Sequence, residues 1–138
     1  MERRSAFRMA VIVGLSFAAG PADSSSPRCR TVQREVQAIE QAMQMYQTEN
    51  GGDCPPNIAA LVAAKLLPKT PVDSWGREFR MRCPGHDGGD TPSDVWSVGS
   101  NGVDEGGAGD DIPNWLTLEE ICRRPQRSPS GCGCPLLQ

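Results

Sequence analysis

The sequence has few aromatic side chains and a single histidine. Of its 138 residues three are Trp, three Phe and one Tyr, and the histidine is His86. This aromatic set is too small for a base-stacking surface, and a net charge of −3 without a basic stripe also disfavours nucleic acid. One histidine argues against a histidine-rich metal site and limits acid–base catalysis. Because no Ser or Cys lies beside a base in a recognisable elbow, the sequence predicts no enzyme.

A long hydrophobic run is also missing. Residues 9–19 are apolar, but a transmembrane helix needs about 20 such residues. The run follows Arg3, Arg4 and Arg8 and leads to the small residues at positions 20–22, which is typical of a signal peptide. We therefore expect residues 1–22 to be a signal- or leader-like segment, residues 23–28 to be a linker, and the exported chain to begin near Asp23.

Six cysteines in so short a chain indicate an oxidising compartment, where a small core is commonly stabilised by disulfides. Cys54 follows the end of a predicted helix and Cys83 ends a predicted strand, each directly before a proline. We expect these two to form a disulfide worth about 3–4 kcal/mol, with two buried thiols as the alternative. The sequence leaves open the pairing of the other four cysteines, which are Cys29, Cys122, Cys132 and Cys134. A zinc site formed by Cys122, Cys132 and Cys134 also remains an alternative.

One long helix is predicted over residues 30–48, because its apolar residues recur at spacings of four and three. Residues 50–52 (NGG) supply its stop. Glu35 and Gln47 are among the polar residues expected to face water. The apolar stripe consists of Val32, Val36, Ile39, Met43 and Tyr46.

A second, short helix is predicted over residues 57–66, with Asn57 as its cap. Alternating apolar residues predict strands at 78–83 and 94–98. The order predicts an α+β domain over residues 29–118, in which an amphipathic helix packs on a small antiparallel sheet. The Arg-, Pro- and Cys-containing residues 119–138 are expected to form a flexible tail.

The stretch between Trp96 and Trp115 is rich in glycine and in oxygen-bearing side chains. Glycine allows tight turns, and converging hard oxygens are what Ca²⁺ prefers. An EF-hand is excluded, because Val103, Gly109 and Ile112 occupy positions where that motif needs ligands. On its residues alone, the loop is either a calcium site or a solvated turn. Outside it we expect Asp73 to cap a turn, His86 to face solvent and the tryptophans, including Trp75, to be anchors.

Several ordered motifs between residues 32 and 115 resemble the major pseudopilins of type II secretion systems. Residues 46–51 (YQTENG) resemble the helix end Y-x-x-x-N-G, and residues 71–79 (PVDSWGREF) resemble P-x-D-P-W-G-x-P-Y. Residues 61–62 (LV) and 66–68 (LLP) are similar to an L-V … L-P segment. Residues 94–102 (DVWSVGSNG), followed by GG at 106–107 and DDIPNW at 110–115, are similar to D-x-x-S-x-G-x-D-G … G-G … D-D-I-x-N-W.

The resemblance implies a pilin-like fold, assembly with other pseudopilin subunits and the secretion machinery into a periplasmic pseudopilus, and a bound calcium ion. Asn101 stands where the family has Asp, which keeps an oxygen but removes a charge. The ligand set that the resemblance implies, with Asp104 as an additional candidate, is the Val98 carbonyl, Asn101, Asp104, Asp110 and Asp111.

The start of the chain departs from the family. Aligning Phe7 places Ala6 where the family has the Gly at the cleavage point, and Val11 where it has a Glu. Two interpretations follow. One is a pseudopilus subunit, associated with the inner membrane through residues 7–19 and facing the periplasm. The other is a soluble exported calcium-binding domain of the same fold, in the periplasm or secreted, that does not form filaments. Which of these holds, and which cargo is secreted, the sequence leaves open.

Overall fold

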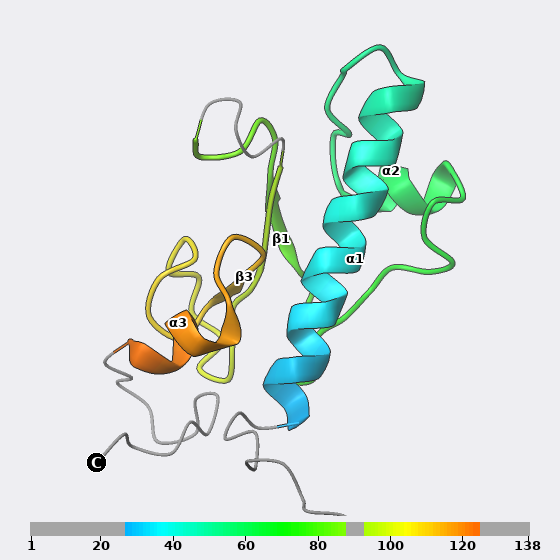
Figure 1. The fold of residues 1–138 in the computed structure, drawn as a ribbon. Helices are drawn as coiled ribbons and strands as arrows, with labels where there is room; N and C mark the ends of the chain where they lie inside the picture. Colours follow the sequence, from blue (N-terminus) through cyan, green and yellow to red (C-terminus); the bar gives the residue numbers. More distant parts are fainter. Residues whose placement is uncertain (1–26, 88–92, 125–138) are drawn as a thin grey trace, which may run out of the picture.

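The computed structural model describes residues 27–87 and 93–124. It confirms the predicted α+β architecture: a long helix packs along a three-stranded antiparallel sheet of order β1-β2-β3 (Figure 1). The expected signal segment, most of the linker and the cysteines Cys132 and Cys134 lie outside the described residues. The elements are α1 (Pro27–Glu49), α2 (Ile58–Ala63), β1 (Arg80–Arg82), β2 (Asp94–Ser97), β3 (Ile112–Pro113) and α3 (Leu118–Arg123).

Helix α1 begins earlier than predicted and ends where the sequence places its stop. It starts at Pro27 rather than at residue 30, since a proline without an N–H group is well suited to a first helical turn. After Glu49, Gly51 adopts a φ of 67° and the N–H of Gly52 donates to the carbonyl of Gln47 at 2.7 Å. This is the left-handed stop expected of the Asn-Gly-Gly sequence.

The buried face of α1 is the predicted stripe, with two additions and one correction. Cys29 at the start of the helix and Ala42 are also buried, whereas Tyr46 is only partly buried. The prediction that Glu35 faces water is wrong in part, because the residue is half-buried. One of its carboxylate oxygens is buried without a hydrogen-bond partner among the described residues. Burial, and secondarily the charge of Asp73, raises the Glu35 pKa.

Helix α2 is shorter than predicted. Its cap is confirmed, because the Asn57 side chain accepts the N–H of Ala60 at 2.9 Å. It ends at Ala63 because Lys65 adopts a φ of 58°, and the next N–H, of Leu66, closes back on the carbonyl of Leu61 at 2.9 Å. This closing pattern terminates a helix with a left-handed residue, here a lysine in place of the usual glycine.

The central strand β2 is buried on both faces. Its four residues pair with β1 on one side and β3 on the other, with Val95 opposite Met81 and Ser97 opposite Ile112. The predicted alternation of buried and exposed residues is therefore absent from this strand. Strands β1 and β2 are each shorter than predicted. Strand β3 was not predicted at all, because a two-residue strand leaves no periodic signal.

The C-terminal part of the domain extends beyond residue 118, where the sequence analysis places the start of a flexible tail. Residues 118–123 form α3, whose Ile121 is 2% exposed and belongs to the core. A capping box begins this helix: Thr117 accepts the N–H of Glu120, and the Glu120 carboxylate accepts the N–H of Thr117 at 2.8 Å. The prediction fails because a short helix with one core residue has too little periodicity to be recognised.

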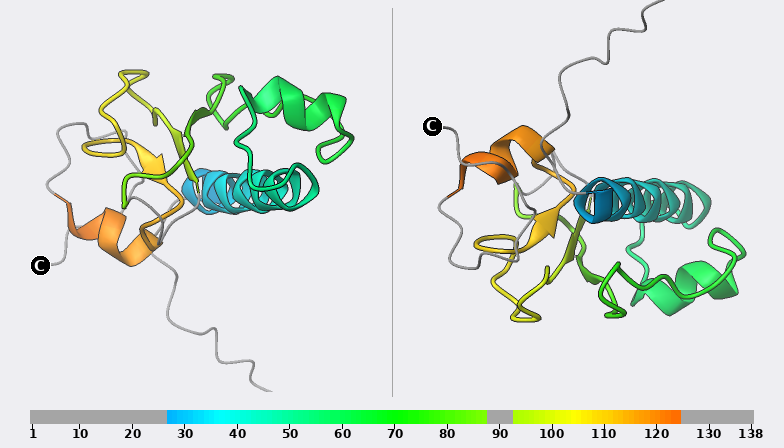
Figure 2. Two further views of the ribbon diagram at one scale, coloured as in Figure 1. Left: turned by 90° about the horizontal axis from the view of Figure 1, so that it is seen from above. Right: turned by 90° about the horizontal axis from the view of Figure 1, so that it is seen from below.

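The predicted disulfide between Cys54 and Cys83 is present, with a Cα–Cα distance of 5.8 Å. It joins the segment after α1 to the end of β1. Cys29 and Cys122 each take part in a disulfide as well. Seen from above and below, α2 lies at one end of the molecule and the loop between β2 and β3 at the other (Figure 2). None of the helices in the described part of the chain has the length and hydropathy of a membrane span.

Candidate functional site

Residues 98–111 form an acidic loop that leaves β2, turns several times on glycines and returns to β3 (Figure 1). Gly99 and Gly107 face atoms that cannot easily shift, so space as well as conformation requires glycine at these two positions. At Gly99, with a φ of 67°, a Cβ atom would collide with the backbone carbonyl of Asp110. At Gly107, with a φ of 90°, it would collide with the indole ring of Trp115. The two ends of the loop therefore approach each other more closely than any side chain would allow.

The entry of the acidic loop is tied to the turn formed by residues 73–77. Asp73, 5% exposed, accepts the backbone N–H groups of Trp75 and Arg77 with Oδ1, both at 2.9 Å. Its other oxygen accepts the hydroxyl of Ser97 at 2.7 Å, and the Ser97 Oγ accepts the N–H of Gly99 at 3.1 Å. The predicted turn-capping role of Asp73 is confirmed, and the structure adds its link to the loop.

Asp111 is the most unusual carboxylate in the loop. Its side chain is fully buried, and Oδ2 accepts the N–H groups of Glu105 and Gly107 at 2.9 and 2.8 Å. The other oxygen, Oδ1, is buried and has no hydrogen-bond partner within the described residues. Burial, and to a smaller extent the charges of Asp104 and Glu105, raise the Asp111 pKa to about 6, against the lowering effect of the two amide hydrogen bonds. An unpaired buried carboxylate oxygen is costly unless a cation or a proton accompanies it.

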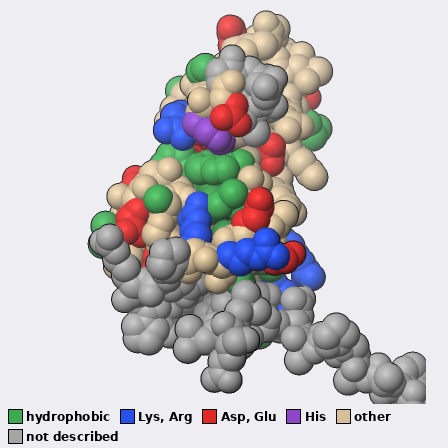
Figure 3. Space-filling model, turned by 60° about the vertical axis from the view of Figure 1, so that its left-hand side comes forward, with side chains coloured by type: hydrophobic (Ala, Val, Ile, Leu, Met, Phe, Trp, Pro, Cys, Tyr) green, Lys and Arg blue, Asp and Glu red, His purple; other side chains and the backbone are tan. Residues whose placement is uncertain are grey.

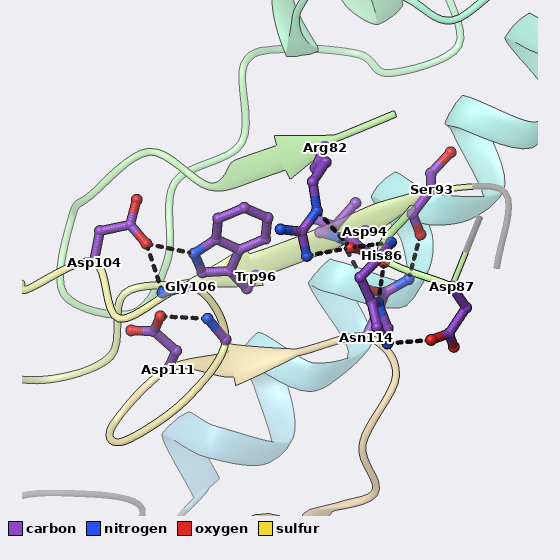
Figure 4. Close-up of polar contacts among 12 residues, drawn as sticks. Arg82, His86, Asp87, Ser93, Asp94, Trp96, Asp104, Gly106, Asp111 and Asn114 are labelled. Carbon is purple, nitrogen blue, oxygen red and sulfur yellow. Dashed lines mark hydrogen bonds and ion pairs between the residues drawn. The ribbon is translucent and has the colours of Figure 1, made fainter. Parts of the chain in front are cut away.

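Asp104 lies on the outer side of the loop, with its side chain 43% exposed. Its Oδ1 accepts the N–H of Gly106 at 3.0 Å and the indole N–H of Trp96 at 2.9 Å (Figure 4). These two hydrogen bonds, and to a smaller extent the charge of Arg80, lower the Asp104 pKa. The carboxylate therefore anchors a tryptophan and closes a turn.

The remaining predicted ligands are spread along the loop. Asn101 is exposed, and its Oδ1 accepts the N–H of Val103 at 2.9 Å. Asp110 is half-buried and accepts the hydroxyl of Ser100 at 2.9 Å. Val98 is buried at the end of β2.

Glu105 belongs to the same acidic cluster, although the sequence analysis omits it. Its carboxylate accepts the N–H of Asp110 at 2.8 Å and fills the space beside Gly109. The quoted family motif leaves this position unspecified, and only the folded loop brings Glu105 to Asp111. Arg77 and Ser97 are the other omissions, because each acts on the loop through backbone groups, which leave no pattern in the sequence.

The acidic loop offers the oxygen ligands that calcium prefers, but it does not bring three acidic side chains together. Within residues 27–87 and 93–124, no three His, Cys, Asp or Glu side chains converge as a metal-holding group. A bound ion would therefore have to combine Asp111, through its unpaired Oδ1, with Asp110 and with neutral oxygens of Asn101 or the backbone. This donor set consists of hard oxygens, which suits Ca²⁺ and disfavours zinc or copper.

A second polar cluster surrounds Asp94, which is fully buried at the start of β2. Arg82 donates to its Oδ2 from Nε at 2.9 Å and from Nη2 at 2.6 Å, and the backbone N–H of His86 adds a third bond at 2.8 Å. The ring Nδ1 of His86 lies 2.9 Å from Oδ1, and Nε2 lies 3.1 Å from a carboxylate oxygen of Asp87 (Figure 4).

His86 is exposed, as predicted, but it is also held in place. Its ring lies 4.7 Å from that of Trp115, which in turn meets Trp96 edge-on at 6.2 Å. The guanidinium of Arg82 lies 5.7 Å above the Trp96 ring. On the surface, the histidine borders a patch of hydrophobic side chains with basic and acidic groups around it (Figure 3). Trp96 and Trp115 are structural anchors, as the sequence predicts.

The fold and the loop define a class of protein: a pilin-like domain in which one long helix packs on a small sheet that carries a glycine-rich acidic loop. Comparison with known families gives the particular one. The model of the family described as "Type II secretion system (T2SS), protein G" matches residues 22–115, which include α1, the sheet and the whole acidic loop. The chain belongs to this family.

One curated relative supports the assignment. The chain is 31% identical over 97 residues to the type II secretion system core protein G of Pseudomonas aeruginosa. The aligned region includes 59% of this chain and 66% of the relative, so the chain spans just under two thirds of that protein's length. No solved structure matches the chain significantly.

Proposed function

We propose that this protein is a non-enzymatic structural subunit of the pseudopilus of a type II secretion system. The observation that carries the proposal is the match of residues 22–115 to the protein G family, because it covers α1, the sheet and the acidic loop together. Its partners are then other pseudopilin subunits and the secretion machinery. Its place is the periplasmic side of the inner membrane, reached by export.

The experiment is a secretion assay in the cell that encodes this chain. Deleting the gene should abolish the release of the folded exoproteins of this pathway into the medium, while their periplasmic amounts rise. The wild-type gene supplied in trans should restore release. Unchanged release, together with recovery of the protein as a soluble periplasmic or secreted monomer, would contradict the proposal and favour an exported domain that does not assemble.

We also propose that the acidic loop binds one calcium ion. The support is the buried and unpaired Oδ1 of Asp111, in a loop where Asp110 and Asn101 offer further oxygens. Val98 would contribute its carbonyl, and Asp104 is the outer candidate. Bound calcium would supply the positive charge that the Asp111 carboxylate lacks among the described residues.

A further inference from the structure

Arg77 reaches from the turn at residues 73–77 to the entry of the acidic loop. Its Nη1 donates to the carbonyl oxygen of Gly99 at 2.7 Å, and the carbonyl oxygen of Ser100 lies 3.4 Å from the same nitrogen. Two successive backbone carbonyls thus face one guanidinium group. Backbone carbonyl oxygens also converge on the positive charge of a bound metal ion such as Ca²⁺. Here the positive charge is that of the arginine.

The loop also closes over this guanidinium. A Cβ atom at Gly102, where φ is 70°, would lie 2.7 Å from Cζ and 2.8 Å from Nε and Nη2 of Arg77. Glycine allows this close approach, whereas a Cβ atom at position 102 would force the guanidinium to shift. Residues 99–102 are therefore shaped around the arginine from two sides.

The arginine is itself fixed in position. Its backbone N–H donates to Oδ1 of Asp73 at 2.9 Å, and its carbonyl accepts the N–H of Asp73 at 2.8 Å. The same aspartate binds Ser97, whose Oγ accepts the N–H of Gly99. Both polar groups of Gly99 are consequently held from one turn, the N–H through Ser97 and the carbonyl through Arg77.

We propose that Arg77 is a built-in cation that orders residues 99–102 without any metal ion. A guanidinium keeps its charge at every physiological pH, and its Nη1 holds two N–H groups in a fixed plane, a geometry that the rotatable ammonium of a lysine does not keep. Calcium would then meet a loop whose entry, including the candidate ligand Asn101, is already in place, and would order only the second half around Asp110 and Asp111. Arg77 is a positioning residue for the loop. The inference extends the calcium proposal, but its decisive test is made in chelator.

The test is hydrogen–deuterium exchange of the full exported chain, read on peptides covering residues 99–102. In chelator, wild-type protein should protect this segment, and Arg77→Gln should exchange it about tenfold faster or more, as expected for loss of a charge-assisted hydrogen bond. Peptides from α1 should be unchanged. The control is Arg34→Gln, an exposed arginine of α1, which should leave residues 99–102 as in wild type.

Equal protection of residues 99–102 in Arg77→Gln and wild type in chelator would overturn the proposal. So would loss of this protection in wild type when calcium is removed, because calcium would then be the ordering cation. If Arg77→Gln does not fold, Arg77→Lys replaces it, with faster exchange expected in the same segment only. The calcium proposal is judged separately, by whether calcium slows exchange around Asp110 and Asp111.

Discussion

The hydroxyl of Ser97 donates to Oδ2 of Asp73 at 2.7 Å, across 24 positions of sequence. The same hydroxyl oxygen accepts the N–H of Gly99. One buried side chain thus joins the turn that follows α2 to the loop that follows β2. The turn that contains Asp73 and the segment that contains Ser97 therefore act together to hold the entry of the acidic loop.

Ser97→Ala should lower the free energy of unfolding by about 1–3 kcal/mol, because it leaves a buried carboxylate oxygen and a buried N–H without their partner. Urea unfolding of the disulfide-intact protein measures the change. Ser74→Ala serves as the control, because Ser74 lies in the same turn and its side chain makes no hydrogen bond within the described residues. Equal stability of the two variants would show that the Ser97 bridge contributes nothing.

Gly107→Ala and Gly106→Ala separate backbone strain from crowding. Both glycines have positive φ, but only at Gly107 would a Cβ atom meet the Trp115 ring, whereas the space beside Gly106 is open. Gly106→Ala should cost about 1–2 kcal/mol of stability, and Gly107→Ala about 1–3 kcal/mol more. Tryptophan fluorescence should shift in the second variant alone. Identical losses would mean that Trp115 yields without cost.

Asp94→Asn should destabilise the protein by about 1.5–3 kcal/mol, since it weakens hydrogen bonds to a buried charge. In this variant Arg82 loses its ionic partner, and the His86 ring loses the carboxylate beside its Nδ1. The matched change Asp87→Asn, at a carboxylate 53% exposed, should cost less than about 1 kcal/mol. Thermal unfolding of both variants gives the comparison, and a larger effect at Asp87 would contradict it.

Calcium should raise the melting temperature of the wild-type protein relative to chelator, because a ligand of the native state stabilises it by mass action. Asp110→Ala should remove most of this rise, as it deletes a charged ligand. Asn101→Asp should enlarge it by restoring a carboxylate. Magnesium at the same concentration is the control for ionic strength. Melting curves that are the same in calcium, in magnesium and in chelator would exclude the site.

Asp111 predicts a pH dependence that can be measured in chelator. Its pKa is raised from 3.8 to about 6 in the folded protein, so the folded state binds the proton more readily than the unfolded chain. The stability it contributes is full below 3.8 and is lost as the pH rises through about 6. Relative to Asp111→Asn, wild type should therefore lose unfolding free energy over this interval.

Asp111→Asn retains an oxygen for the N–H groups of Glu105 and Gly107 and removes the charge. Above about pH 6 it should therefore match or exceed wild type in chelator, and fall below it in calcium. A stability difference between the two proteins that stays constant with pH would show that Asp111 does not titrate as described.

The sequence by itself determined the features that arise from local periodicity and turn chemistry. The apolar stripe of α1, the Asn-Gly-Gly stop, the Asn57 cap and the Asp73 turn each depend on residues within a few positions of one another. The Cys54–Cys83 disulfide could also be predicted, because both cysteines lie at element ends. The family emerged from the order of such local motifs.

Only the tertiary structure decided what depends on contacts between distant segments. Strand β3 forms because it pairs with β2, and helix α3 forms because its Ile121 packs into the core. Neither element is long enough to show a periodic pattern in the sequence. Burial makes Asp111 differ from Asp110, its neighbour in sequence. In the sequence nothing distinguishes Arg77 from other charged residues. The fold places its guanidinium against the carbonyl of Gly99, 22 residues away. Backbone groups are the same in every residue except proline, so the sequence does not reveal their partners, which depend on the geometry of the fold.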